Sequence, residues 1–330
     1  MGNKRYLDDK LVFLAGSTGL AGSSIMSYIL NNYPTTKIRA AYYKHTQPFI
    51  EHERIDYVYG ELKSKEDCER MVKSCDCAIM AAANTTGSGT INIHPYEQVN
   101  DNVIINVQML STFHLEGIKR VVFIGSATLY QEFEGHIKED ELDFNKDPHS
   151  AYLGIGWVMR FIEKLCKFWH DCFSMEIIIV RAANIFGPYA KFNPLTSNVI
   201  PAIIRKAVDK MDPFEVWASP DVTRDVLYSE DLGRAIAMMI DNDKIKFDIF
   251  NLGSGVQTTV GQVVELALKY ANHKPSDIIY ISDKPTTIKF KALDCSKAKE
   301  ILGWQPRYIV EEGIQKTTEW WIKNKGWWKK

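Results

Sequence analysis

The chain is constrained above all by a glycine-rich turn that follows its first apolar segment. Residues 11–15 (Leu-Val-Phe-Leu-Ala) are an apolar run of the length of one buried strand. Gly16, Gly19 and Gly22 follow, and apolar residues then recur at helical spacing over 25–30. A strand, a glycine turn and a helix in this order predict a dinucleotide-binding site. The glycines permit a tight turn and close packing, and the helix N-terminus offers N–H groups to the phosphates.

Apolar strands and helices continue to alternate up to Gly187. This alternation predicts an α/β fold, namely a Rossmann-type doubly wound parallel sheet with helices on both faces. Ligands of such sheets bind beyond the carboxyl ends of the strands. The expected strands are 37–43, 56–59, 77–83, 120–125 and 176–181, and the expected helices are 65–73, 96–116 and 151–173.

The predicted elements become shorter and more mixed after Gly187. We therefore expect a dinucleotide-binding Rossmann domain over 1–187, with returning elements near 223–255, and a smaller substrate-binding region over 188–330. The expected strands in the second part are 214–217, 225–228 and 250–255, and the expected helices are 199–210, 231–240, 259–272, 296–302 and 310–324.

Composition and charge narrow the range of partners. The 330 residues carry a net charge of −1, which gives no reason to expect nucleic acid or an anionic membrane as a partner. No apolar run reaches the ~18 residues of a membrane span, and the first residues lack the apolar core of a signal peptide. The six cysteines follow neither a disulfide nor a zinc spacing. We expect reduced thiols, no bound metal and a cytoplasmic location.

The end of the second predicted strand bears on the choice of cofactor. An acidic residue at this place favours NAD, whereas a cation accommodates the 2′-phosphate of NADP. The sequence offers Tyr42, Tyr43, Lys44 and His45 there, without a carboxylate. On charge alone, these residues slightly favour NADP.

The Gly-x-x-Gly-x-x-Gly spacing resembles that of the extended short-chain dehydrogenase/reductase superfamily, the NAD-dependent epimerase/dehydratase family. By this resemblance, Glu61 and Leu62 contact adenine, and the small residues 81–83 let the backbone pass close to the cofactor. Asn102 matches a residue that steadies the central strands. The resemblance implies a cofactor site made of Gly16, Thr18, Gly19, Leu20, Gly22, Lys44, Glu61, Leu62, Ala81, Ala82, Ala83, Asn102 and Met159.

The same superfamily transfers hydride with three side chains. A Ser or Thr orients the carbonyl, a Tyr carries the proton, and a Lys lowers the pKa of the Tyr and holds the nicotinamide ribose. Residues 121–130 resemble the family's strand that ends in Ser-x-x-x-Tyr, which places Ser126 on the catalytic hydroxyl.

The Tyr-x-x-x-Lys motif is not intact. If the alignment is anchored on Ser-Ala-Tyr, Tyr152 is the catalytic Tyr and Gly156 replaces the Lys. If it is anchored on the following helix, Ile155 replaces the Tyr and Met159 replaces the Lys. We favour the second alignment because it needs no gap before residue 181. In both alignments the Lys is lost. The proton acceptor is then Tyr152, Thr128 or a water; the alternative for Tyr152 is that it only packs against its neighbours.

A later segment, Asn-Ile-Phe-Gly-Pro at 184–188 followed by Asn-Val-Ile-Pro-Ala at 198–202, resembles GDP-fucose synthase and related GDP-sugar enzymes. The resemblance spans about residues 10–323. It implies that Asn184 contacts the sugar, and Arg224 offers a fork suited to phosphate. The implied substrate residues are Asn184, Asn198, Val199, Trp217, Arg224 and Lys291.

Two positions depart from this pattern. Fucose synthase epimerises its substrate with a Cys two residues after the Ser and a His before Val-Ile-Pro, where this chain has Thr128 and Asn198. Neither residue is a general acid or base near neutral pH, so we do not expect epimerisation. The combination is most similar to the GDP-heptose 4-dehydrogenases of bacterial capsule pathways, which lack the usual motif and depend on NAD.

This resemblance implies an NAD-dependent oxidoreductase that oxidises C4 of GDP-D-glycero-D-manno-heptose in capsule polysaccharide biosynthesis. The resemblance, rather than the residues at the second strand, makes NAD the expected cofactor, with NADP as the alternative. An NADPH-dependent GDP-4-keto-sugar reductase and a non-catalytic nucleotide-sugar binder are the rival hypotheses. A homodimer through the helices 96–116 and 151–173 is expected from the family.

Overall fold

The computed structural model of the protein describes residues 4–43, 50–85, 95–281 and 292–326. Two of the predicted site residues, Lys44 and Lys291, lie outside these ranges.

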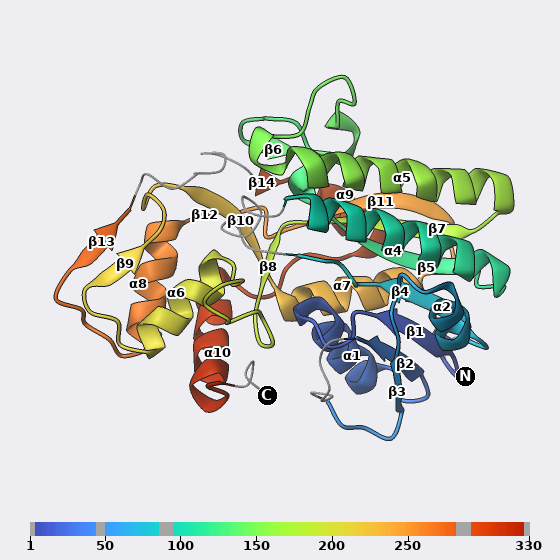
Figure 1. The fold of residues 1–330 in the computed structure, drawn as a ribbon, viewed down its shortest axis with the longest axis horizontal. Helices are drawn as coiled ribbons and strands as arrows, with labels where there is room; N and C mark the ends of the chain where they lie inside the picture. The colour runs from blue at the N-terminus through green and yellow to red at the C-terminus, as the bar shows by residue number, and fades with distance from the viewer. Residues whose placement is uncertain (1–3, 44–49, 86–94, 282–291, 327–330) are drawn as a thin grey trace.

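Seven parallel strands form the central sheet, in the order β11-β7-β5-β4-β1-β2-β3 (Figure 1). The predicted α/β class with a Rossmann-type doubly wound sheet is confirmed. The strand order reverses between β1 and β4, which is where sheets of this kind bind their ligands. The strands are β1 (Leu11–Ala15), β2 (Lys37–Tyr42), β3 (Ile55–Tyr59), β4 (Cys77–Met80), β5 (Arg120–Ser126), β7 (Glu176–Ala182) and β11 (Phe247–Leu252).

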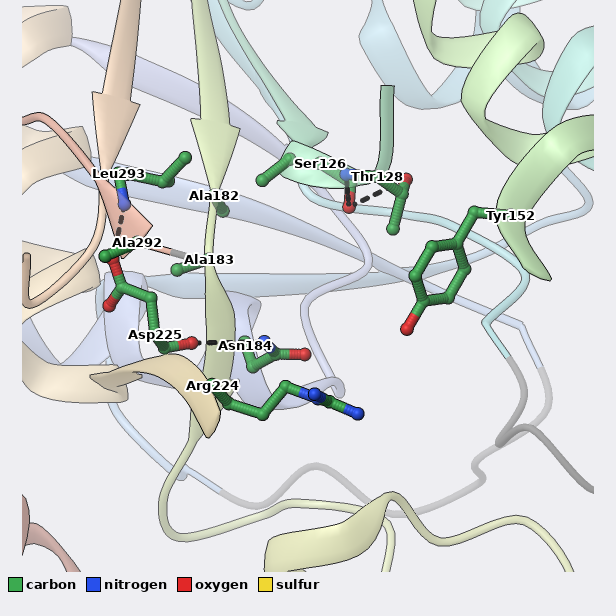
Figure 2. Close-up of a pocket in the computed structure, with 11 residues that line it drawn as sticks. Ser126, Thr128, Tyr152, Ala182, Ala183, Asn184, Arg224, Asp225, Ala292 and Leu293 are labelled. Atoms are coloured by element: carbon green, nitrogen blue, oxygen red, sulfur yellow. Dashed lines mark hydrogen bonds between the residues drawn. The ribbon is translucent and has the colours of Figure 1, made fainter. Parts of the chain in front are cut away.

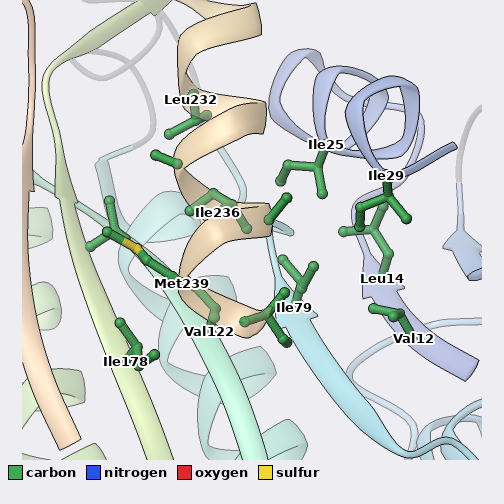
Figure 3. Close-up of a cluster of buried hydrophobic side chains, with 14 of the residues drawn as sticks. Val12, Leu14, Ile25, Ile29, Ile79, Val122, Ile178, Leu232, Ile236 and Met239 are labelled. Atoms are coloured by element: carbon green, nitrogen blue, oxygen red, sulfur yellow. The ribbon is translucent and has the colours of Figure 1, made fainter. Parts of the chain in front are cut away.

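Helices cover both faces of this sheet. On one face, α1 (Leu20–Asn32) and α7 (Ser229–Asp241) pack over a cluster that includes Val12 and Leu14 (Figure 3). Phe13 belongs to the cluster on the other face. Because successive strand residues point to opposite faces, both sets are buried, which explains the continuous apolar run of β1. The helices of the second face are α2 (Lys65–Val72), α4 (Pro95–Leu115) and α5 (Leu153–Phe173).

The later part of the chain builds its own apolar core, the C-terminal core. Phe192, Ile204, Phe214, Val264 and Trp321 are among its buried residues. The helices of this part are α6 (Val199–Val208), α8 (Val260–Tyr270), α9 (Ser296–Leu302) and α10 (Val310–Lys323), and its strands are β8 (Asn184–Phe186), β9 (Phe214–Val216), β10 (Thr223–Tyr228), β12 (Gln257–Thr259) and β13 (Ile278–Tyr280). A short strand, β14 (Ala292–Leu293), pairs with β6 (His136–Ile137) of the first part. The division of the chain at residue 187 stays a prediction.

Some predicted boundaries differ from the observed ones. The run 77–83 pairs only as far as Met80, because its neighbour β1 ends at Ala15, the residue that faces Met80. The following alanines therefore leave the sheet. β10 begins at Thr223 rather than 225, since its first residues pair with β12. The short strands β6, β8, β12, β13 and β14 were not predicted.

Arg120, at the start of β5, ties the sheet to the end of α7. The side chain is almost completely buried. Its Nε donates to Ile240 O (2.7 Å), and its terminal nitrogens donate to Met239 O (2.9 Å) and to the Glu176 carboxylate (2.8 Å). The guanidinium thus satisfies carbonyls that the end of α7 leaves without helical partners.

The variant Arg120→Met should lower the free energy of unfolding by about 3–5 kcal/mol, because it leaves buried acceptors without their charged donor. Urea unfolding followed by circular dichroism measures this loss. Lys65→Met is the control: Lys65 is exposed and pairs with Glu69 one turn further along α2 (3.7 Å), so a loss below about 1 kcal/mol is expected. Equal unfolding midpoints for the two variants would contradict the role of Arg120 as the link between the sheet and α7.

Candidate active site

The glycine turn between β1 and α1 leaves room for a ligand but none for side chains. Gly16 has a φ of +76°, and a Cβ on it would lie 2.7 Å from Ala81 O. A Cβ on Gly22 would lie 2.2 Å from Gly16 O. Gly19 precedes α1, and no side chain caps the first turn of this helix. The N–H groups of that turn can therefore bind an anion, so the residues present fit a dinucleotide pyrophosphate.

Two further residues of the predicted cofactor site belong to this turn. Thr18 is buried within it. Leu20 opens α1 and packs against the C-terminal core, so the start of the cofactor helix touches the later part of the chain.

The structure brings a carboxylate to the end of β2, where the sequence of that strand itself offers none. β2 and β3 are parallel neighbours that end at the same edge, with Tyr42 beside Tyr59. The carboxylate of Glu61, just after β3, accepts a hydrogen bond from Tyr43 and raises the pKa of that phenol. Leu62 is buried beside it. The resemblance assigned Glu61 to adenine, whereas its place beside the end of β2 follows from the pairing of β2 with β3.

The segment that leaves β4 is held from two sides. Ala81 and Ala82 pass against Gly16. Asn102, which is buried in α4, accepts a hydrogen bond from Asn84 N (3.0 Å) and donates to Asn84 O (2.9 Å). Ala83 lies between these two anchors, so the path of residues 81–84 is fixed along the edge of the glycine turn.

A pocket opens beyond the carboxyl ends of β5 and β7 (Figure 2). It brings together all three predicted catalytic residues and two of the predicted substrate residues. The lining residues are Ser126, Ala127, Thr128, Tyr152, Ala182, Ala183, Asn184, Arg224, Asp225, Ala292 and Leu293.

Two hydroxyls meet at one wall of this pocket. Ser126 is the last residue of β5, and its Oγ accepts hydrogen bonds from Thr128 N (3.2 Å) and from Thr128 Oγ1 (3.1 Å). Tyr152 lies in a one-turn helix, Ser150–Tyr152, that leads into α5. In Figure 2 its phenol points into the pocket, toward the side on which Arg224 lies.

Neither alignment of the broken motif places a cation in the pocket. Met159 is buried in the apolar cluster under the sheet, and its sulfur lies 3.9 Å from a Cβ built on Gly125. A Cβ on Gly156 would meet Thr128 O at 2.8 Å, so this position packs against the loop after Ser126. The eleven lining residues include no Lys, His or Cys.

The predicted substrate residues lie in the later part of the chain. Two of them line the pocket: Asn184 donates to Asp225 O (3.1 Å), and Arg224 donates to Thr223 O (2.7 Å). Burial lowers the pKa of Arg224. Asn198 precedes α6 without a side-chain capping bond. Val199 and Trp217 are exposed and do not line the pocket.

A buried ion pair that the sequence reasoning did not use supports the pocket from below. Arg181 of β7 donates two hydrogen bonds of 2.8 Å to Glu163 of α5. It also donates to the hydroxyl of Tyr130 (2.7 Å), which in turn donates to Asn251 (2.7 Å). Burial alone would lower the pKa of Arg181, but Glu163 raises it overall. The network fixes α5, β7 and the turn after Ser126 relative to one another.

Asp225 is a second residue that the sequence reasoning passed over. Its buried carboxylate accepts hydrogen bonds from Ser254 N and Oγ (2.8 Å each), from Gly255 N (3.3 Å) and from Leu293 N (3.0 Å). Burial raises its pKa, and these four donors oppose that rise. Asp225 thus fixes the strand that carries Arg224 to the turn at 254–255 and to Leu293, which also lines the pocket.

This combination of a doubly wound sheet, a glycine turn and a hydroxyl-lined pocket defines the short-chain dehydrogenase/reductase class of nicotinamide enzymes. Residues 12–253 match the NAD dependent epimerase/dehydratase family, and the chain belongs to that family. The predicted family and the predicted nicotinamide cofactor are thereby confirmed, as is the assignment to NAD(P)-dependent sugar-nucleotide enzymes.

Curated relatives at about a quarter identity span nearly the whole chain. A putative GDP-L-fucose synthase 2 of Arabidopsis thaliana is 26% identical over 95% of this chain and 92% of its own. The GDP-L-fucose synthase of Escherichia coli is 24% identical over 95% and 97%. A GDP-mannose 3,5-epimerase of Arabidopsis thaliana is 26% identical over 80% and 69%.

Solved structures share the fold. The UDP-glucose 4-epimerase of Thermotoga maritima, with UDP-glucose, has a TM-score of 0.82 at 20% identity and covers 95% of this chain and 99% of its own. The dTDP-glucose 4,6-dehydratase of Bacillus anthracis, with NAD, has a TM-score of 0.81 at 21% identity and covers 97% of this chain and 99% of its own.

Within the described ranges, every helix is too short or too polar to cross a membrane.

The variant Asp225→Asn should destabilise the protein, because its amide NH₂ would face donors that now point at a carboxylate oxygen. Each buried donor left without an acceptor costs about 1–3 kcal/mol. Thermal unfolding of this variant is compared with that of Asp221→Asn, which changes an exposed residue four positions earlier and should shift stability by less than about 0.5 kcal/mol. If both variants unfold at the wild-type temperature, Asp225 does not anchor the pocket.

Proposed function

We propose that this protein oxidises a nucleotide sugar with NAD, at C4 of GDP-D-glycero-D-manno-heptose, as a step in the biosynthesis of a capsule or related polysaccharide. The observation that carries the proposal is the pocket of Figure 2, which has hydroxyl groups and an arginine but no Lys, His or Cys among its lining residues. Such a pocket suits hydride transfer at one carbinol better than repeated protonation of carbon.

Oxidation of a carbinol removes a hydride from carbon and a proton from oxygen. The nicotinamide, when bound, supplies the hydride acceptor. Ser126 Oγ already accepts two hydrogen bonds from Thr128. Its own hydrogen is therefore left to donate to the C4 oxygen, and this bond orients the carbinol. The hydroxyl proton passes to Tyr152, which faces the same space, or through Thr128 or a water.

The substrate's diphosphate is assigned to Arg224. Its guanidinium reaches the pocket from β10 and suits bidentate contact with phosphate oxygens. Asn184, on the parallel neighbour β8, lies beside it and is assigned to the sugar. Asn198, Val199, Trp217 and Lys291 are assigned to the nucleotide by resemblance.

Epimerisation is not part of the proposal. By the resemblance, Thr128 corresponds to the fucose synthase Cys and Asn198 to its His, and of these two residues Thr128 lines the pocket. A hydroxyl and an amide do not exchange protons with carbon near neutral pH.

NAD is proposed over NADP because of Glu61. Its carboxylate holds Tyr43 at the edge where β2 and β3 end together. An acidic group at the end of the second strand binds the ribose hydroxyls of NAD and repels the 2′-phosphate of NADP. We propose that the Glu61 carboxylate, which lies beside that strand end, has this effect in addition to the adenine contact that the resemblance implies.

We also propose a homodimer in the cytoplasm. The neighbouring helices α4 and α5 expose several large apolar side chains, among them Ile104 and Leu115 of α4 and Phe161 and Phe168 of α5. Exposed apolar patches of this kind mark protein–protein contacts, and a two-fold pair of such faces is self-complementary. All six cysteines are unpaired, as expected for a reducing compartment.

A second candidate is the reverse reaction, reduction of a GDP-4-keto sugar with NADPH. The relatives named GDP-L-fucose synthase, which match nearly the whole chain, favour it. The same Ser126 and Tyr152 would serve as donors to the keto oxygen.

The first experiment identifies the nucleotide that copurifies and follows the absorbance of reduced nicotinamide as GDP-mannose or GDP-heptose is added. Sugar-dependent formation of NADH is the expected result. Bound NADP with turnover of a keto sugar would favour the reductase instead. Bound nucleotide without redox change for any GDP-sugar would leave only a binding protein.

Ser126→Ala should lower kcat by about 10²-fold, the effect of losing one well-placed donor to the reacting oxygen. Steady-state rates of sugar-dependent NADH formation measure this effect. The control is Ser111→Ala, which removes a hydroxyl bonded only within α4 and should leave the rate unchanged. An equally active Ser126→Ala variant would remove Ser126 from the mechanism.

Glu61→Gln should shift the cofactor preference toward NADP, since it removes the charge that opposes the 2′-phosphate. The ratio of kcat/KM for NADP to that for NAD should rise by about 10-fold, as expected for one lost charge repulsion of roughly 1.4 kcal/mol. Glu66→Gln, which neutralises an exposed carboxylate of α2, should leave the ratio as it is. No change with Glu61→Gln would argue against this basis for the NAD assignment.

A further inference from the structure

A lysine from the later part of the chain reaches the cofactor half of the molecule. Lys191 lies in the loop between β8 and α6. Its ammonium donates to the backbone carbonyl of Thr85 and to Thr85 Oγ1 (3.0 Å). Thr85 belongs to the segment that leaves β4, so these bonds join two segments that are 106 residues apart in sequence.

The charge on this ammonium is not balanced by a carboxylate in the described part of the chain. Burial around the nitrogen lowers the pKa of Lys191, and no charged neighbour acts on it there. The residue as a whole is exposed, although protein atoms surround part of its ammonium. An ammonium has three donors, and two are used by Thr85. A partly desolvated ammonium with a third donor is stabilised by an anion.

The position of Lys191 in the fold indicates which anion its ammonium would bind. Thr85 follows closely on Ala81 and Ala82, which touch Gly16 of the glycine turn. Leu20, the first residue of α1, packs against the C-terminal core that the Lys191 loop also joins through Phe192. The ammonium is therefore held at the edge where the pyrophosphate of a dinucleotide crosses from β1 to β4. The glycine turn itself provides N–H groups but no positive side chain.

We propose that Lys191 is a cofactor-binding residue, whose ammonium pairs with a phosphate of the bound dinucleotide while it stays bonded to Thr85. The loop that leads into the substrate side of the molecule is then attached to the cofactor by an ion pair. The proposal rests on the dinucleotide site and not on the identity of the sugar. It can therefore fail while the proposed function holds, and it can hold while the proposed function fails.

Binding of NADH to the full-length protein, followed by quenching of tryptophan fluorescence, tests the proposal without any turnover. Lys191→Gln should raise the Kd for NADH by about 10- to 100-fold, as expected for the loss of one charged hydrogen bond. Lys191→Arg, which keeps the charge, should stay within about threefold of the wild type. The dependence of Kd on salt should also weaken in Lys191→Gln, because one fewer charge pair is screened.

The matched control is Lys210→Gln. Lys210 also donates its ammonium to two backbone carbonyls, those of Ala271 and Asn272, but it does so at the far ends of α6 and α8. This variant should bind NADH as the wild type does. Binding of GDP is measured for all variants, and Lys191→Gln should leave it within about twofold.

Two outcomes would overturn the proposal. One is a Kd for NADH that does not change in Lys191→Gln. The other is a loss of GDP affinity in place of NADH affinity, which would assign Lys191 to the diphosphate of the sugar nucleotide.

Discussion

The close approach of the glycine turn to the segment that leaves β4 is the constraint on which the rest of the site depends. Ala81 O would lie 2.7 Å from a Cβ at Gly16, so the two backbones meet without room for a side chain. This contact sits where the strand order reverses between β1 and β4. It brings the first turn of α1, the alanines after β4 and, through Thr85, the ammonium of Lys191 to one edge of the sheet. A dinucleotide can lie there because the N–H groups of the first turn of α1 and the backbone after β4 meet at that edge.

The pocket beside this edge keeps its walls without a lysine among its lining residues. Met159, where the favoured sequence alignment expects a lysine in place of methionine, lies within the buried cluster rather than in the pocket. The pocket wall does not depend on that position. It is held by the ion pair of Arg181 with Glu163 beneath the sheet and by the four hydrogen bonds to Asp225. The structural charges thus lie below the site, and the pocket lining itself contains no lysine.

The sequence predicted the parts of the molecule that follow from local pattern. The apolar run 11–15, the glycine turn and the helices around the sheet have periods that a chain of this class must show, and they were placed within a few residues. Ser126, Thr128 and Tyr152 were expected together and do line one pocket. What escaped prediction depends on contacts between distant segments. The end of β4 is set by its neighbour β1, and the hydrogen bond of Tyr43 to Glu61 joins the ends of two neighbouring strands. Asp225 finds its donors 29, 30 and 68 residues further along the chain.

The last strand of the sheet comes from late in the chain. β11 (Phe247–Leu252) pairs with β7 along its whole length, and α7 covers the face behind it, although both follow the first elements of the substrate side. A fragment that stopped near residue 187 would expose β7 as an unpaired edge and would tend to aggregate. Exchange of whole domains between relatives would therefore break the sheet. New sugar specificities in such a scaffold must arise from changes in the loops at its carboxyl edge, since these are the parts that can be replaced without cutting a shared strand.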